Sequence, residues 1–260
     1  LNNRLTVSFD WFNRKTINMV GPAPELPVTL GANVPKMNNA DMQSTGFELD
    51  LGWRDRIKDF DYGVHLLLSD DRQKILKYPN TTGKINTWYV GKYNGDIWGF
   101  ETIGIAKSQE EMDAHLASLP NGGQDALGVK WGAGDIMYRD LNGDGKISDG
   151  ATLNDPGDKK VIGNSSPRFR FGLDLNASWK GIDVRLFFQG VAKRDAWLND
   201  NMFWGATGGI WQSACFTSHL DFFREEGDDF WSANKDAYFP LILVDNFAKN
   251  QKTQTRYLQN

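Results

Sequence analysis

The stretch Arg168–Trp179 reads RFRFGLDLNASW and decides the fold class of this chain. Every second residue from Phe169 to Trp179 is apolar, whereas the residues between them, from Arg168 to Ser178, are polar, charged or glycine. Successive side chains of a β-strand point to opposite faces of a sheet. The alternation therefore predicts a long strand with one apolar face and one polar face.

The same period of two recurs in four other stretches. These predicted strands lie near residues 4–20, 43–53, 60–69 and 182–191, and Phe187 interrupts the polar face of the last of them. Each run has about ten residues, which is the length of a tilted strand that crosses a bilayer. Strands of ordinary globular proteins are shorter, with about five or six residues. The lengths favour membrane-spanning strands.

The connections between the predicted strands fall into two length classes. Residues 54–59 and 180–181 are short, whereas residues 21–42, 70–167 and 192–260 are long. Short turns on one side and long loops on the other are typical of outer-membrane barrels. We therefore predict an all-β chain that forms an antiparallel segment of a large transmembrane β-barrel. Its long loops would be extracellular and would contain one short helix.

Aromatic residues near the strand ends favour a barrel over its main alternative. An antiparallel sandwich with one solvated face shows the same alternation, so a secreted β-sandwich that binds or cleaves glycans is the competing interpretation. A barrel places aromatic girdles at both membrane interfaces. The residues in girdle-like positions are Trp11, Trp53, Phe60, Trp179 and Phe188.

Composition excludes several classes of protein. The 260 residues include 33 acidic and 29 basic residues, so there is no broad cationic surface for nucleic acid. No window approaches the roughly 18 to 20 consecutive apolar residues of a membrane-spanning helix. Cys215 is the single cysteine, which excludes a disulfide framework and a thiolate metal site.

The number of strands indicates a fragment. The chain begins at Leu1 with neither methionine nor a secretion signal, so we expect a mature or excised piece of a longer protein. The smallest outer-membrane barrels have about eight strands, and an open edge cannot exist in lipid. Five strands are too few to close, so we expect a portion of a larger barrel.

Two local elements are predicted within the long loops. Residues 87–93 and 96–105 are expected to form a hairpin around the turn dipeptide Asn94-Gly95. A capping-box pattern that begins at Ser108 predicts a short helix over residues 108–119.

Several motifs resemble one family. GDIMYRDLNGDGKIS (134–148) and the stretch DPGDKKVIGNSSPRFRFG that begins at Asp155 resemble the C-terminal barrel region of the SusC/RagA family. These proteins are TonB-dependent outer-membrane transporters of Bacteroidota. The opening LTVSFDWFNRKTINMV, PAPELPVTLGANVPKMNNA, GFELDLGWRDRI and residues 96–102 are also similar to that family.

The resemblance implies a fold and a function. It implies a barrel of about 22 strands with an N-terminal plug, located in the outer membrane and driven by TonB. It also implies a SusD-like lipoprotein lid and an oligosaccharide or peptide cargo. The chain shows neither the plug nor the segment that TonB binds, so we expect it to supply barrel wall and lid-docking loops. A porin without energised gating is a further alternative.

An Asp/Asn/Gly loop is the candidate metal site. Oxygen ligands at its first, third and fifth positions match a calcium loop, and the seventh ligand would be a backbone carbonyl. Ala151 occupies the twelfth position, where a calcium-binding helix–loop–helix has glutamate, so Asp155 or Asp158 are further candidates for the missing carboxylate. The other possibility is a solvated turn that binds nothing. The predicted ligands of calcium are Asp140, Asn142, Asp144, Lys146 and Asp149.

No catalytic residues are predicted, and the chain is not expected to be an enzyme. The three histidines lie far apart in sequence, and the acidic pairs at 225–226 and 228–229 are interpreted as a charged surface loop. Aromatic side chains in the last loop are expected to contact the lipoprotein or to pack the loop, in preference to direct contact with cargo. These candidates are Trp197, Trp204, Trp211 and Trp231.

Overall fold

A five-stranded antiparallel sheet is the largest element of the fold. The computed structural model describes residues 3–23, 35–208, 216–227 and 230–260. Adjacent strands follow the order β1-β2-β3-β8-β9. Their bounds are Leu5–Gly21 for β1, Met37–Ile57 for β2, Phe60–Lys77 for β3, Arg168–Trp179 for β8 and Ile182–Lys193 for β9.

The strand register gathers apolar side chains on one face of the sheet, which we call the apolar face. One row across it consists of Val7, Leu51, Leu66, Leu173 and Phe188. The neighbouring row on the opposite face, the polar face, consists of Thr6, Gly52, His65, Asp174 and Phe187. The alternation of the sequence is thus in phase across all five strands, as a sheet with two different environments requires.

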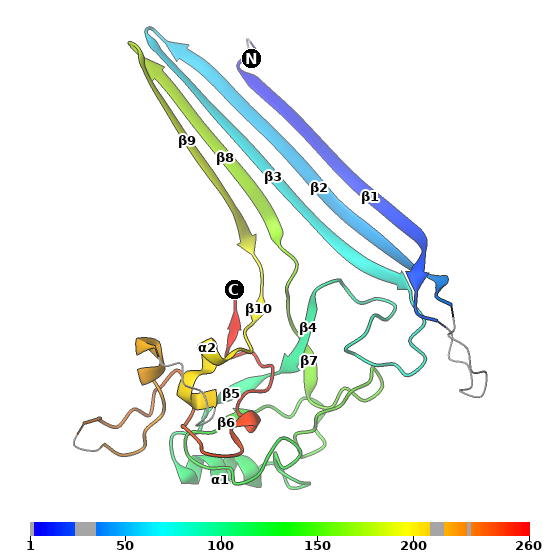
Figure 1. Ribbon diagram of the computed structural model, residues 1–260, viewed down its shortest axis with the longest axis vertical. Helices are drawn as coiled ribbons and strands as arrows, with labels where there is room; N and C mark the ends of the chain where they lie inside the picture. Colours follow the sequence, from blue (N-terminus) through cyan, green and yellow to red (C-terminus); the bar gives the residue numbers. More distant parts are fainter. Residues whose placement is uncertain (1–2, 24–34, 209–215, 228–229) are drawn as a thin grey trace.

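The two ends of the sheet differ. At one end, tight turns join β2 to β3 and β8 to β9, and Lys180 and Gly181 have the positive φ values, 48° and 84°, that tight hairpin turns require. The long connections lie at the other end (Figure 1). We call them the loop unit, which comprises the described parts of residues 78–167 and 194–260.

Two strands extend beyond their predicted ends. β2 begins at Met37, inside the stretch 21–42 predicted as a loop, and β3 continues to Lys77, inside the stretch 70–167. In β2 the alternation of apolar side chains begins only at Phe47. The hydrogen bonds between neighbouring strands do not need this alternation, because they are made by the backbone N–H and C=O groups. The strand boundaries predicted from side-chain pattern were therefore too short.

The loop unit contains the remaining helices and strands. From the first long connection come β4 (Asp96–Phe100), β5 (Thr102–Ile105), α1 (Gln109–Ala117), β6 (Ile136–Tyr138) and β7 (Lys159–Asn164). From the last come β10 (Ala196–Trp197), α2 (Asn201–Trp204), β11 (Leu258–Gln259) and 3₁₀ turns at Gly205–Gly208, Thr217–Leu220 and Phe247–Lys249.

The predicted hairpin is wrong, whereas the predicted helix is present. β4 pairs with β7 and β5 pairs with β6, so residues 96–105 find their partners far along the chain. Asn94-Gly95 still forms a turn, closed by the Asp96 N–H donating to the Tyr93 carbonyl at 3.2 Å. Ser108 caps α1 by accepting from the Glu111 N–H at 3.3 Å. Within the described ranges, no helix is both long and apolar enough to cross a membrane.

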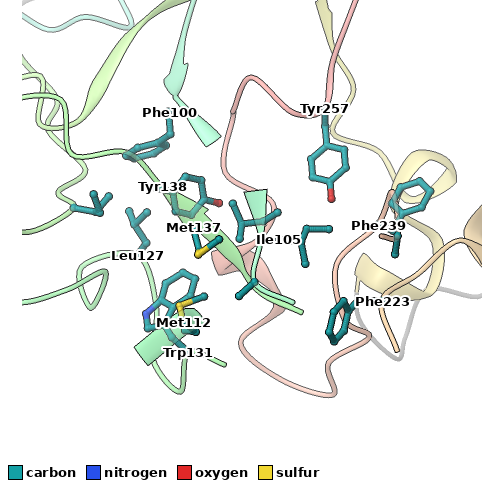
Figure 2. Close-up of a cluster of buried hydrophobic side chains, with 14 of the residues drawn as sticks. Phe100, Ile105, Met112, Leu127, Trp131, Met137, Tyr138, Phe223, Phe239 and Tyr257 are labelled. Atoms are coloured by element: carbon teal, nitrogen blue, oxygen red, sulfur yellow. The ribbon is translucent and has the colours of Figure 1, made fainter. Parts of the chain in front are cut away.

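The two long connections share one hydrophobic core. Phe100, Met112 and Tyr138 come from the first connection, and Phe239 and Tyr257 come from the second. Figure 2 shows these side chains gathered together. Hydrogen bonds tie the same segments, since the Tyr138 hydroxyl donates to the Lys249 carbonyl at 2.7 Å. The described part of the stretch after residue 192 is therefore packed into a folded unit and is not a simple surface loop.

Candidate functional site

The polar face of the sheet carries a cluster of charged side chains near the end with the tight turns. Asp50 lies 2.7 Å from His65 (Oδ1 to Nε2), and the Arg185 guanidinium donates to the Asp174 carboxylate at 3.0 and 3.1 Å. His65 and Asp174 are register partners on adjacent strands. A cavity of about 710 Å³ lies over this cluster. The arrangement gives this face a hydrated, charged surface.

Two apolar side chains interrupt the polar face. Leu67 and Phe187 are both exposed and lie on either side of Gly172, which leaves room between them. An adjoining cavity of about 530 Å³ is otherwise lined mostly by polar residues such as Asp10 and Gln189. The alternation revealed Phe187. The same alternation also places Leu67 on the polar face, because it lies between Leu66 and Leu68, which are both on the apolar face.

The predicted metal loop is folded around its own backbone. Asp140 accepts hydrogen bonds from the N–H groups of Gly143, at 2.6 Å, and Gly145, at 2.9 Å. Partial burial raises the pKa of the Asp140 carboxyl, but backbone N–H donors, Gly145 and Gly143 first among them, outweigh this and place the pKa below its ordinary value. Both glycines have positive φ, 75° and 77°. The loop therefore holds its shape by hydrogen bonds.

Asn142 and Asp144 complete the same turn. The Asn142 side-chain oxygen accepts from the Asp144 N–H at 2.9 Å, and the Asp144 carboxylate accepts from the Lys146 N–H at 3.2 Å. These are short-range bonds in which the side chain caps the turn that contains it. The three oxygen-bearing side chains thus follow the predicted loop and already have partners.

Of the candidates for a further carboxylate, Asp149 and Asp158 have different partners in the structure. Asp149 pairs with the ammonium groups of Lys159 and Lys252, at 2.6 and 3.7 Å. Asp158 is fully buried and accepts from Leu141 and Ser148, which clamps both ends of the loop. Among the described residues, no three His, Cys, Asp or Glu side chains form a group that could hold a metal ion.

Calcium binding by this loop stays a prediction, and it is testable. If calcium binds, free calcium at about 100 times its Kd should slow proteolysis within the loop by about 100-fold, because binding suppresses opening. The measurement is a time course of limited proteolysis of the full-length protein with and without calcium. Asp140→Asn should remove the response, whereas the exposed Asp125→Asn should retain it. Identical rates with and without calcium would refute the prediction.

The predicted aromatic contact residues separate into three groups. Trp204 is only 2% exposed and packs at the centre of the loop unit, 4.9 Å from the Tyr257 ring between centroids, so it cannot meet a partner. Trp197 is partly buried against the same core. Trp231 is 40% exposed and lies 5.4 Å from the Arg224 guanidinium. Trp211 lies outside the described residues.

A cluster that the sequence did not suggest stabilises the loop unit. Lys249 and Asp135 are 1% and 3% exposed and form an ion pair of 2.6 Å. The Lys249 ammonium also donates to the Lys130 carbonyl at 2.7 Å, and Asn250 donates to Asp135 at 2.8 Å. Every charge in this cluster is paired, as burial requires.

Comparison with known proteins gives two related sequences. TonB-dependent receptor P3 of Formosa agariphila is 25% identical over 202 residues, which are 72% of this chain and 18% of the receptor. TonB-dependent receptor P26 of the same organism is 28% identical over 202 residues, 73% of this chain and 19% of the receptor. The chain thus spans less than a fifth of the length of these relatives. No family model matches it.

Comparison with solved structures gives the fold. The RagAB peptide transporter has a TM-score of 0.65 at 23% identity, over 100% of this chain and 26% of that chain. The RagAB peptide importer in the 'open-open' state has a TM-score of 0.61 at 20% identity. The predicted resemblance to TonB-dependent transporters and the antiparallel barrel-segment fold are thereby confirmed. TonB-dependent receptors are outer-membrane proteins, so the predicted location is confirmed as well.

Proposed function

We propose that this chain forms wall and extracellular loops of a TonB-dependent transporter that imports oligosaccharide or peptide nutrients with a SusD-like lipoprotein. One observation carries the proposal: the apolar side chains from Val7 to Phe188 form a face on which none is buried, and those of the two edge strands are exposed, while the opposite face is charged. Val7, Leu186 and Phe188 are 55%, 50% and 52% exposed. Hydrocarbon chains of a membrane are the solvent that suits such a face.

The same observation disfavours the β-sandwich. A sandwich buries the apolar faces of two sheets against each other, with a core about 10 Å thick. Among the described residues, the buried apolar cluster lies in the loop unit, whereas the apolar side chains of the sheet face are partly buried or exposed. In water, that face would be an aggregation surface.

The polar face is proposed to line the passage for cargo. Its charged cluster around His65 and its apolar pair, Leu67 and Phe187, offer both ionic and apolar contacts along one wall. Peptides carry both kinds of groups, and sugar rings also have polar edges and apolar faces. RagAB, which shares the fold, is described as a peptide transporter. Both classes of cargo therefore belong in the test.

The loop unit is proposed to meet the lipoprotein. Among the described residues of the loop unit, Phe230 is the most exposed aromatic side chain, at 90%, and Trp231 beside it is 40% exposed. Aromatic residues that become buried in an interface carry much of its binding energy. Their place at the loop end of the sheet would put them at the extracellular mouth of a barrel.

A complementation experiment tests the proposal. A strain that lacks the full-length transporter should lose uptake of labelled peptides or oligosaccharides, and loss of TonB should have the same effect. Trp231→Ala in the restored protein should weaken co-purification of the lipoprotein by about 30-fold, as expected for an interfacial hot spot. Trp88→Ala is the matched control, because Trp88 is 38% exposed against 40% for Trp231.

Two results would contradict the proposal. Unchanged uptake of both nutrient classes in the deletion strain would exclude a transport role. Equal co-purification with the Trp231→Ala and Trp88→Ala variants would exclude Trp231 from the interface.

A further inference from the structure

The apolar face changes its chemistry abruptly at its loop end. The last aromatic row on this face is Trp11, Phe47 and Asp70, in register across β1, β2 and β3. The next row consists of Asn13, Thr45 and Arg72, and the one after it consists of Lys15, Gln43 and Lys74. Cations therefore follow directly on the aromatic girdle, on the side of the sheet that faces lipid.

These cations surround a cavity together with Tyr93. The segment after residue 90 pairs with the end of β3, because Lys74 and Tyr93 are bridge partners. The Arg72 guanidinium lies 4.3 Å from the centre of the Tyr93 ring, and the Lys74 ammonium lies 5.7 Å from it. The cavity has a volume of about 420 Å³. Its wall is thus cationic and aromatic.

The charge of this pocket is not balanced by the described protein. Asp70 is the acid among its lining residues, and Arg168 pairs with it through two hydrogen bonds. Among the described residues, no carboxylate forms an ion pair with Arg72 or Lys74. The pocket therefore presents two positive charges to an anion.

The height of the pocket identifies the anion. Arg72 and Lys74 lie two and four residues beyond the row of Asp70, or about 5 and 10 Å along the membrane normal for a tilted strand. The polar headgroup layer extends about 5 to 8 Å beyond the hydrocarbon on each side, so Arg72 lies within this layer and Lys74 lies at its outer edge. A phosphate at this level belongs to a lipid headgroup.

We infer that the Arg72–Lys74–Tyr93 pocket binds the phosphorylated headgroup of an outer-leaflet lipid. The inference rests on the proposed function, since it requires the apolar face to lie in the membrane with the loop unit outside. The guanidinium and ammonium groups pair with the phosphate oxygens, and Tyr93 holds Arg72 in place by its ring. A lipid bound in this way would hold the loop end of the sheet at the membrane surface.

The test uses the purified full-length transporter and lipid A as the probe. Native mass spectrometry measures the Kd of lipid A for the wild type, Arg72→Gln and Lys74→Gln. Each substitution should weaken binding by about fivefold, and the double variant by about 25-fold, because each cation near a lipid surface contributes comparably. Arg14→Gln is the matched control, since Arg14 is an exposed cation at the same height on the polar face. Its Kd should stay within about twofold of the wild type.

Further measurements distinguish a lipid phosphate from free phosphate, and failure of this inference from failure of the proposed function. Dephosphorylated lipid A should bind more weakly and should not distinguish the variants, whereas displacement of lipid A by inorganic phosphate would overturn the lipid assignment. Equal affinities for all variants, each checked for folding by heat-modifiable gel mobility, would overturn the site. If the wild type still imports nutrient in that case, the proposed function stands and this inference alone fails.

Discussion

Replacing Leu173 by arginine is expected to destabilise the membrane-inserted sheet by about 2–4 kcal/mol, the cost of a cation on the lipid face near the bilayer midplane. Leu173 lies near the middle of β8, between Leu66 and Phe188 on the apolar face. An arginine there has no carboxylate partner and no water. The measurement is the amount of folded protein in the outer membrane, together with the urea midpoint of the refolded protein.

A substitution on the opposite face provides the control. Gln189→Arg introduces the same charge into the neighbouring strand, but Gln189 is exposed on the polar face. It should change the stability by less than about 1 kcal/mol, because the charge stays in water. Equal effects of the two substitutions would mean that the apolar face does not contact lipid, and the transporter proposal would lose its main support.

Replacing Lys249 by methionine is expected to destabilise the loop unit by about 3–5 kcal/mol, since it leaves the Asp135 carboxylate buried without its partner. Both side chains are almost fully buried, and the ammonium also bonds to two backbone carbonyls. The free energy of local opening, measured by amide hydrogen exchange of α1 and β6 in the full-length protein, reports the effect.

Lys252 offers a matched control for this substitution. It lies three residues further on, and its ion pair with Asp149 is longer, at 3.7 Å, and more exposed. Lys252→Met should therefore cost no more than about 1 kcal/mol. If Lys249→Met is equally mild, the buried pair is not the tie between the two long connections.

The strands and their two faces were predictable because the relevant pattern is local. Phe171, Leu173 and Leu175 alternate with polar neighbours, and a one-residue slip would move every side chain to the wrong face. The helix α1 was predictable for a similar reason, since Ser108 and Glu111 form their capping bond within one turn.

The candidate sites were predictable only in part. The oxygens of Asp140, Asn142 and Asp144 form the turn that their spacing suggests, because those bonds are short-range. The buried carboxylate of Asp158 was one of several candidates, and sequence spacing alone did not select it. Trp204 shows the same limit, since a tryptophan that packs a core and one that docks a partner look alike in a sequence.

The sequence by itself determined that this chain builds long strands with one apolar face and one polar face, because a period of two needs no knowledge of distant residues. Tertiary structure decided how the long connections fold. β4 meets β7 across more than fifty residues of chain, and the buried Lys249 finds its carboxylate partner Asp135 more than a hundred residues away. Such contacts form between segments that are far apart in sequence and that the ends of the sheet strands bring close together. No local sequence pattern specifies which distant segments will meet.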